Sequence, residues 1–346
     1  MLLLWACTGH PVDTAEPVDP VVELSEAGPH GVGYREGSVT YEGVAGSRTL
    51  RLATWYPTSD TSGFDATYLG GLIEAEGVLA DAEPDPGPFP VVVFSHGHQG
   101  YAEAASFLME HLASHGWLVV SPDHTGNTTF DSADRDTAIY LQRPEDLSAV
   151  LDHTEQGWDV TETVVAMGHS FGGLSLYAVG GSPFDAAGIE ADCAAGSDDA
   201  ICSTLDAELL AAFSSSYRDD RVDALLPMAS GDFSRFGAAN VAAVEVPVLM
   251  MDGSLDTGKA EESTWYWDAL GGEPHRRLHL VGAHHNTFTD YSGLIEQHEE
   301  LIDPEEGWRI VRTYALAFAR FVDGDTSLEG FLSGDPAMSS AVEWGS

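Results

Sequence analysis

Short, continuous apolar runs alternate along this chain with segments of helical periodicity, and this alternation is the strongest constraint on its fold. Val91–Phe94 and Thr163–Met167 are typical of strands that are buried on both faces. Such strands, joined by helices, form a mostly parallel central sheet that helices flank on both sides, which is the α/β class. The other predicted strands are Arg48–Tyr56 as an outer strand, Trp117–Val120, Val222–Met228, Val246–Met251 and Arg276–Val281.

The helical segments and the polar stretches divide the chain into one domain and two ends. The predicted helices are Tyr101–His115, Pro144–Glu155, a helix that begins at Phe171, and Glu305–Phe321. A single domain is expected over residues 29–323, with a small irregular insertion at about residues 183–218, after the helix from Phe171. Residues 1–28 read as a signal and an acidic, Pro-rich linker, and residues 324–346 as a tail.

The motif Gly168-His169-Ser170-Phe171-Gly172 matches G-x-S-x-G between a predicted buried strand and a predicted helix. A serine on such a sharp turn needs small neighbours, and the helix N-terminus lies under the oxygen that becomes anionic. We therefore predict that Ser170 is the nucleophile of a hydrolase.

A serine hydroxyl needs a base to remove its proton, and hydrolases with this motif place the acid and then the histidine after the serine. His284 and His285 lie on a loop at the carboxyl end of the strand Arg276–Val281. Ligands of parallel sheets bind at this end of the strands. Spacing alone leaves both histidines as candidates for the base.

The acid that orients the histidine is expected after a strand that precedes it. Asp256 lies beyond a turn that follows the strand Val246–Met251, so its carboxylate can reach the next loop. We predict Asp256 as the acid, with Asp232 and Asp252 as alternatives. Turn capping is the ordinary role of such aspartates.

An oxyanion needs two backbone N–H donors. One is expected from Phe171, the residue after the nucleophile, and the other from the loop Ser95–Gly100 after the first buried strand. His98 supplies that backbone N–H in our interpretation. His96 and His98 can also be read as metal ligands, but no carboxylate cluster lies near them in sequence, so we predict no metal and no cofactor.

Three cysteines indicate the compartment. Leu4-Trp5-Ala6-Cys7 resembles a bacterial lipobox, although no basic region precedes it and the apolar run is short. We interpret it as a clipped lipoprotein signal with Cys7 as the lipidation site and a membrane tether, the alternative being an ordinary disordered N-terminus. Cys193 and Cys202 then remain as a pair, which predicts a disulfide and a bacterial, extracytoplasmic location, lipid-anchored or secreted.

The net charge limits the classes of partner and substrate that we expect. Lys and Arg total 14 against 56 Asp and Glu, which gives a formal net charge of −42. A surface this acidic repels nucleic acid and anionic bilayers, so neither is an expected partner. The same repulsion favours neutral esters over anionic ones as substrates.

Several blocks in a fixed order resemble one family, the bacterial dienelactone-hydrolase-like esterases related to plasma-type platelet-activating factor acetylhydrolase, within the α/β-hydrolase fold. The blocks are Gly28–Gly33, Trp55–Pro57, Phe94–Gly97, Ser121–Thr128, Arg143–Leu147 and Gly168–Gly173. The resemblance covers residues 28–321. It implies His285 as the catalytic histidine and His98 as the second oxyanion donor.

The resemblance also bears on the acid and the substrate. Acetylhydrolase relatives place the acid after the strand that corresponds to Val222–Met228, where this chain has no aspartate at the matching position. Polyester-cleaving relatives resemble Gly253–Asp256 instead, but they carry Met where this chain has Phe171. We predict a serine hydrolase of carboxylic esters with a triad of Ser170, His285 and Asp256. The alternatives are a phospholipid acyl hydrolase or a polyester hydrolase on the same machinery, and a non-enzymatic surface protein.

Overall fold

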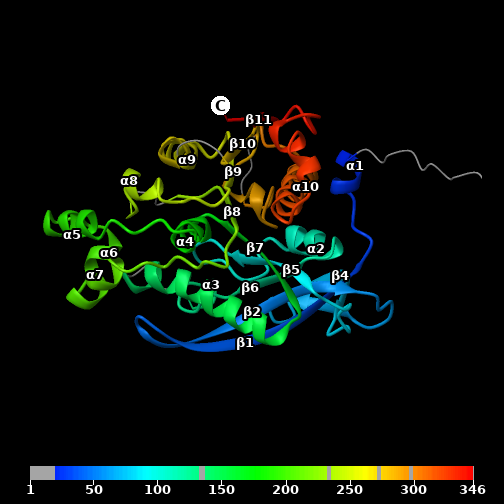
Figure 1. The fold of residues 1–346 in the computed structure, drawn as a ribbon, viewed down its shortest axis with the longest axis horizontal. Coiled ribbons are helices and arrows are strands. Elements are labelled where there is room, and N and C mark those ends of the chain that lie inside the picture. The colour runs from blue at the N-terminus through cyan, green and yellow to red at the C-terminus, as the bar shows by residue number, and fades with distance from the viewer. Residues whose placement is uncertain (1–19, 132–136, 232–234, 271–273, 296–298, 346) are drawn as a thin grey trace, which may run out of the picture.

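The computed structural model describes residues 20–131, 137–231, 235–270, 274–295 and 299–345. Its centre is one 11-stranded sheet with the strand order β11-β10-β9-β8-β7-β5-β6-β2-β1-β4-β3. Helices lie on both faces of this sheet (Figure 1). The predicted α/β fold with a mostly parallel central sheet is confirmed.

Six neighbouring strands form the parallel centre of the sheet, and they contain the apolar runs of the sequence. They are β6 (Leu118–Pro122), β5 (Phe89–Ser95), β7 (Val160–His169), β8 (Ala224–Met228), β9 (Leu249–Gly253) and β10 (Arg276–Leu280). Every residue of β6, β8 and β9 is buried. Their carboxyl ends meet at one edge of the sheet, which is where the candidate site lies.

Antiparallel strands extend the sheet at both ends. They are β1 (Gly31–Gly43), β2 (Gly46–Thr58), β3 (Asp65–Tyr68) and β11 (Val342–Trp344), while β4 (Ile73–Ala80) runs parallel to β1. The expectation of an outer strand at Arg48–Tyr56 is wrong, because β2 pairs with β1 on one side and with β6 on the other. Trp55 and Tyr56 are accordingly fully buried.

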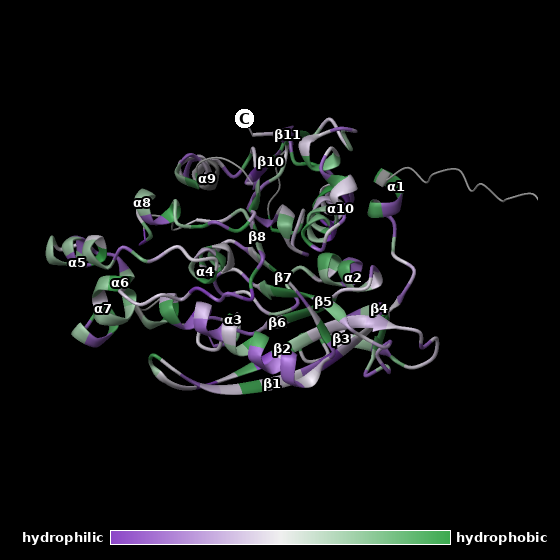
Figure 2. Cartoon of the chain, viewed as in Figure 1, coloured by the Kyte–Doolittle hydropathy of each residue, from purple (hydrophilic) through white to green (hydrophobic). Residues whose placement is uncertain are grey.

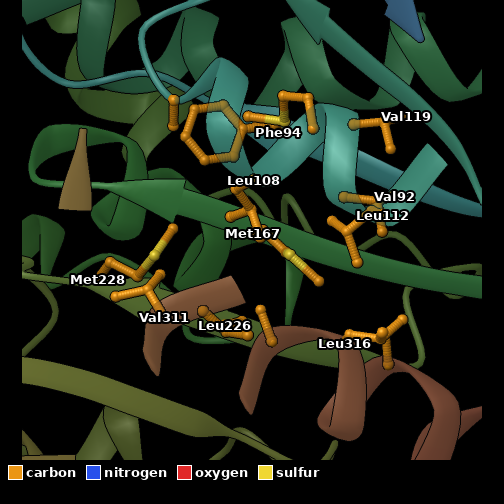
Figure 3. Packing of buried hydrophobic residues seen from close by; sticks show 14 of the residues in the cluster. Val92, Phe94, Leu108, Leu112, Val119, Met167, Leu226, Met228, Val311 and Leu316 are labelled. Carbon is orange, nitrogen blue, oxygen red and sulfur yellow. The ribbon is translucent and has the colours of Figure 1, made fainter. Parts of the chain in front are cut away.

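Two helical layers cover the two faces of the sheet. One layer contains α2 (Ser106–Ser114) and α10 (Pro304–Val322), and the other contains α3 (Thr137–Gly157), α4 (Phe171–Val179) and α9 (Thr257–Leu270). Alternate residues of a strand point to opposite faces. On β5, Val92 and Phe94 therefore pack under α2 and α10 (Figure 3), whereas Val91 and Val93 pack under α3 and α4. Figure 2 colours the residues by hydropathy and shows that α3 and α10 each carry both polar and apolar residues, as helices that cover a sheet do.

Two predicted helices begin elsewhere in the structure. α3 begins at Thr137 rather than Pro144, because the apolar residues Ile139–Leu141 are buried and extend the helix upstream, with Pro144 inside it. α2 begins at Ser106 rather than Tyr101, since the carboxylate of Asp290 accepts the N–H groups of Ser106 and Phe107. Asp290 comes from a distant part of the sequence, so no local pattern indicates this boundary.

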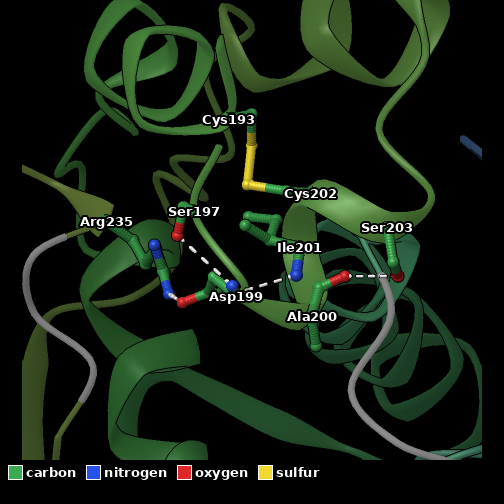
Figure 4. Close-up of a disulfide and its surroundings, with 8 residues drawn as sticks. All are labelled: Cys193, Ser197, Asp199, Ala200, Ile201, Cys202, Ser203 and Arg235. Atoms are coloured by element: carbon green, nitrogen blue, oxygen red, sulfur yellow. Dashed lines mark hydrogen bonds and ion pairs between the residues drawn. A yellow bond between two sulfur atoms is a disulfide. The ribbon is translucent and has the colours of Figure 1, made fainter. Parts of the chain in front are cut away.

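The insertion is helical rather than irregular. It contains α5 (Ala186–Ala194), α6 (Ala200–Ser203) and α7 (Ala207–Phe213), and α8 (Ala238–Val241) follows β8. Cys193 and Cys202 form a disulfide that joins α5 to α6 (Figure 4). Between them, Asp199 caps α6 and forms an ion pair with Arg235. Cross-linking and capping thus give this short segment a defined structure without a large core of its own.

Both ends of the described chain pack on the domain. α1 (Pro20–Ser25), within the predicted linker, lies beside α10, and the Leu24 carbonyl accepts a hydrogen bond from His111. The predicted tail contains two 3-10 turns, η3 (Thr326–Leu328) and η4 (Phe331–Ser333), and the strand β11 at the sheet edge. Within the described residues, no helix is both long enough and apolar enough to span a membrane.

Candidate active site

Ser170 lies at the turn between β7 and α4, where the sequence motif predicts a sharp change of direction. Its backbone has φ of 54° and ψ of −121°, a conformation that residues other than glycine rarely adopt. The Ser170 N–H donates to the carbonyl of Met228 on β8 at 2.9 Å. The strained turn presents the Ser170 hydroxyl at the carboxyl edge of the sheet, as the nucleophile of a hydrolase requires.

Close packing explains why glycine follows in this motif. A Cβ atom on Gly172 would lie 1.9 Å from the carbonyl oxygen of Ser95, and one on Gly173 would lie 1.6 Å from the hydroxyl of Ser230. No side chain fits at either position without moving backbone or a buried neighbour. Gly172 therefore lets the first turn of α4 approach β5, next to the Ser95–Gly100 loop, and Gly173 lets it approach the segment after β8.

His285 is the histidine that reaches the serine. Its Nε2 atom lies 3.0 Å from Ser170 Oγ, so the hydroxyl donates to Nε2 when the imidazole proton is on Nδ1. The neighbouring His284 instead accepts the N–H of His285 through its own Nδ1 at 2.8 Å, and it caps the 3-10 turn η2 (His285–Phe288). Of the two candidates that spacing left open, the structure brings His285 to Ser170.

Asp256 is the carboxylate beside this histidine. His285 Nδ1 donates to Asp256 Oδ2 at 2.6 Å. Asp252, one of the alternatives, is buried and bonded to Arg277 and His279 instead. The other alternative, Asp232, lies outside the described residues.

Backbone hydrogen bonds fix the acid loop against the histidine loop. The N–H of Ser254 donates to the carbonyl of Leu280, and that of Leu255 donates to the carbonyl of Ala283. The hydroxyl of Ser254 accepts the N–H of Gly282. These bonds follow from the parallel pairing of β9 with β10, which brings the two strand ends side by side. Asp256 and His285 are thus held at hydrogen-bonding distance before any substrate binds.

His169, inside the motif, contacts the same histidine from the other side. Its Nε2–H donates to the backbone carbonyl of His285 at 2.9 Å, and the two rings lie 4.7 Å apart. Burial, with the neighbouring His285, lowers the pKa of His169 to about 3. His169 is therefore neutral at physiological pH and orients the loop that carries His285. The G-x-S-x-G pattern leaves this position free, so sequence reasoning missed it.

The loop predicted to supply an oxyanion donor lies against the nucleophile. A Cβ atom on Gly97 would lie 3.3 Å from the Cβ of Ser170. The next residue, His98, has its ring edge-on to that of Phe171, with 6.3 Å between centroids. The two predicted donors, His98 and Phe171, therefore flank Ser170 from β5 and from α4.

A network of buried polar residues beneath this loop was missed by sequence reasoning. Arg143 on α3 is fully buried and donates to Asn127, to Ser95 Oγ at 3.3 Å and to the carbonyl of His96. Ser95 in turn donates to His124 Nε2 at 2.9 Å. Arg143 and Asn127 entered the sequence analysis only as parts of family blocks. Arg143 lies just before the predicted helix Pro144–Glu155, and no local pattern in the sequence indicates its burial.

His96 and Cys7 are the remaining residues for which the sequence suggested a functional role. Both ring nitrogens of His96 are engaged, Nδ1 with the Gly97 carbonyl and Nε2 with the His124 N–H. Within the described part of the chain, no group of three or more His, Cys, Asp or Glu side chains could hold a metal ion. Cys7, the predicted lipidation site, lies outside the described residues.

Comparisons with known proteins bear on the fold and on the class of reaction. The sequence model of the Chlorophyllase family matches residues 74–197. No curated protein sequence matches the chain. Among solved structures, a ferulic acid esterase from Streptomyces cinnamoneus is similar, with a TM-score of 0.65, 22% sequence identity, and coverage of 92% of this chain and 98% of that chain. The chain therefore has the α/β-hydrolase fold, and the two matches together support a carboxylic-ester hydrolase.

Proposed function

We propose that this α/β-hydrolase is a serine esterase that cleaves neutral carboxylic esters through Ser170, His285 and Asp256. One observation carries the proposal: a continuous hydrogen-bonded relay runs from Ser170 Oγ through both ring nitrogens of His285 to Asp256. Nucleophile, base and orienting acid in this order are the requirements of acyl transfer through a serine.

The relay explains how an unreactive hydroxyl attacks an ester. As Ser170 Oγ bonds to the ester carbonyl carbon, its proton moves to His285 Nε2, and the imidazolium that forms is stabilised by the carboxylate of Asp256. His285 then gives that proton to the departing alkoxide, which leaves as an alcohol. A water molecule, deprotonated by the same Nε2 atom, then attacks the acyl carbon, the bond from that carbon to Ser170 Oγ breaks, and Oγ takes the proton back from Nε2 as the carboxylic acid leaves.

Two backbone N–H groups complete the proposed mechanism. In the tetrahedral intermediate, the N–H groups of His98 and Phe171 hold the negative oxygen, because these residues flank Ser170 from two sides. Such preorganised donors stabilise the transition state more than the ground state, and losing one typically costs about 3 kcal/mol.

Charge and apolar surface favour a neutral ester with an apolar group. The net charge of −42 repels anionic substrates. Three large apolar side chains are exposed near the candidate site. Phe130 lies on the segment that bonds to the end of the Ser95–Gly100 loop, and Leu294 and Ile295 lie on the segment that follows η2. Because the structural neighbour is a ferulic acid esterase, an aromatic acyl ester belongs among the substrates to be tested. Phospholipid and polyester substrates remain the alternatives on the same machinery.

The test uses the full chain, a short p-nitrophenyl ester and a fluorophosphonate probe. Wild-type protein should hydrolyse the ester and be labelled at Ser170, and Ser170→Ala should lose both properties. Activity of Ser170→Ala at the wild-type level would overturn the proposal. A panel of p-nitrophenyl esters of rising chain length, methyl ferulate and phospholipid vesicles then separates a small-ester esterase from a lipid hydrolase, which should prefer long chains and interfaces.

We also propose an extracytoplasmic location with a lipid tether at Cys7. The disulfide between Cys193 and Cys202 supports an oxidising compartment, where such bonds persist. Mass spectrometry of the membrane fraction of the bacteria that naturally make the protein tests the tether, since a lipidated protein begins at Cys7 and carries the mass of acyl chains. An unmodified N-terminus in the soluble fraction would contradict it.

A further inference from the structure

Arg143 makes an unusual set of contacts for a buried cation. It is fully buried on α3, and its guanidinium donates to three acceptors of the described chain: Asn127 Oδ1 at 2.8 Å, Ser95 Oγ at 3.3 Å and the backbone carbonyl of His96. Two of these acceptors belong to the segment that runs from β5 into the loop beside Ser170. A buried guanidinium is retained only where its hydrogen bonds compensate for the lost hydration.

One chain of hydrogen bonds runs from Arg143 through Asn127 to His98, the first proposed oxyanion donor. Asn127 accepts from Arg143 through Oδ1, and its Nδ2–H donates to His98 Nδ1 at 2.8 Å. The acceptor role of Oδ1 toward a guanidinium fixes which way the Asn127 amide points. The position of the His98 side chain therefore depends on Arg143, and the bond to the His96 carbonyl fixes the backbone that leads to it.

Arg143 also contacts the ring of Phe171, the second proposed donor. The guanidinium carbon of Arg143 lies 4.7 Å from the centre of the Phe171 ring. Tyr140, on the preceding turn of the same helix, packs edge-on against that ring with 5.0 Å between centroids. One buried side chain thus touches the anchor of His98 and the ring of Phe171 at once.

We propose that Arg143 is a positioning residue that holds the two halves of the oxyanion site in register. This inference rests on the proposed esterase function and adds to it a residue that never meets the substrate. It predicts that Arg143 acts on the transition state, where the oxyanion exists, and leaves substrate binding in the ground state nearly unchanged.

A second serine, histidine and aspartate set lies beside Arg143 and serves as its support. Ser95 Oγ donates to His124 Nε2 at 2.9 Å, and His124 Nδ1 donates to Asp146 at 2.8 Å. All three side chains are fully buried, so no ester can reach this serine. Arg48 also pairs with Asp146 at 2.8 Å. The set therefore fixes the hydroxyl that accepts from Arg143.

Two variants of the full-length protein test the proposal. Arg143→Lys keeps a cation but loses the planar fork that reaches several acceptors at once, and Asn127→Ala cuts the link to His98 while leaving Arg143 in place. For a short p-nitrophenyl ester, kcat per active site should fall roughly tenfold or more in each, since losing a whole donor costs roughly 10²–10³-fold. KM and the pH at which activity is half-maximal should stay as in wild type, because the relay of Ser170 and His285 is intact.

Active sites are counted by labelling Ser170 with a fluorophosphonate to completion, so that misfolded protein does not enter kcat. The affinity for a trifluoromethyl ketone, which forms an oxyanion on Ser170, should fall in parallel with kcat/KM. In Arg143→Ala, added guanidinium should restore part of kcat. Arg221→Lys is the control, because the Arg221 guanidinium also makes several hydrogen bonds but lies before β8, at the amino ends of the parallel strands and away from the site at their carboxyl ends.

A purely structural role for Arg143 gives a different result. It lowers the fraction of protein that the probe labels and leaves kcat per labelled site within about twofold of wild type, and that result would overturn the inference. Failure of the esterase proposal is recognised separately, because the wild-type protein would then show no hydrolysis of the ester, or Ser170→Ala would keep full activity, whatever Arg143 does.

Discussion

The Nδ1 atom of His285 lies 2.6 Å from Oδ2 of Asp256, although 29 positions separate the two residues in sequence. Their loops follow β9 and β10, which pair in parallel, and backbone bonds between the two loops fix the spacing. The sheet therefore sets the orientation of the imidazole, and the side chains need little further adjustment.

Asp256→Asn tests the importance of that contact. The amide cannot stabilise an imidazolium and favours the wrong tautomer of His285, so kcat/KM should fall by roughly several hundred-fold or more. Asp252→Asn is the control, because Asp252 bonds to Arg277 and His279 instead. Steady-state kinetics with a p-nitrophenyl ester measure kcat/KM for both variants. A large loss of kcat/KM in Asp252→Asn with none in Asp256→Asn would show that Asp252 is the acid.

Gly172→Ala tests the packing behind the nucleophile. The added Cβ would lie 1.9 Å from the carbonyl oxygen of Ser95, so backbone must move, and we expect the free energy of unfolding to fall by more than about 3 kcal/mol. Gly157→Ala is the matched control, since its Cβ would meet no atom within 4 Å. Denaturant titration compares the two, and equal stabilities would show that the turn relaxes without cost.

Removal of the disulfide should destabilise the protein. Cys193 and Cys202 are separated by 9 positions, and closing so short a loop stabilises a fold by about 3 kcal/mol in the chain-entropy account. The variant with serine at both positions should unfold at a lower temperature than wild type. A reducing agent should lower the wild-type unfolding temperature and leave that of the variant unchanged; an effect on both would point to a different cause.

Buried neutral histidines should make the fold sensitive to acid. Burial lowers the pKa of both His111 and His169 to about 3, against 6.5 in the unfolded chain. Between these values the unfolded chain binds more protons, so each histidine lowers the free energy of unfolding by up to about 1.4 kcal/mol per pH unit as the pH falls below 6.5. His111→Gln should show a shallower loss of stability from pH 6.5 to 4 in denaturant titrations, and an identical slope would exclude this contribution.

Salt should weaken the preference for neutral esters. The net charge of −42 repels an anionic ester at low ionic strength, and the screening length falls from about 10 Å at 0.1 M to about 3 Å at 1 M salt. The ratio of kcat/KM for a neutral ester to that for a carboxylated analogue should therefore decrease as salt is added. Two neutral esters give the reference ratio, and a preference that salt does not change would remove any role for the charge.

The sequence predicted the elements whose signals are local. The runs at β5 and β7 and the motif at Ser170 depend on neighbouring residues, so their places could be read directly. The boundary of α2 could not be read, because Asp290, which caps it, comes from far along the chain. The strand Val342–Trp344 lies in the predicted tail, because a strand at a sheet edge is specified by its partner, β10, and not by its own residues alone.

The same distinction applies to the site. Ser170 and the two candidate histidines follow from motif and strand order, whereas the choice between His284 and His285 depended on resemblance. His169 and Arg143 act through contacts that join separate segments, with the backbone of His285 and with Asn127. A pattern within one segment cannot specify a contact of this kind, so these positioning residues became visible only in three dimensions.

The strand β11 has a practical consequence for anyone who shortens the protein. It pairs with β10, and Trp344 also packs edge-on against Tyr314 at 5.3 Å. A chain that stops at residue 323 would leave the N–H and C=O groups of β10 without their neighbour, and an open strand edge is a template for aggregation. Trimming this end for crystallisation or secretion therefore carries a solubility risk, and affinity tags are better attached beyond residue 346 than in place of the final strand.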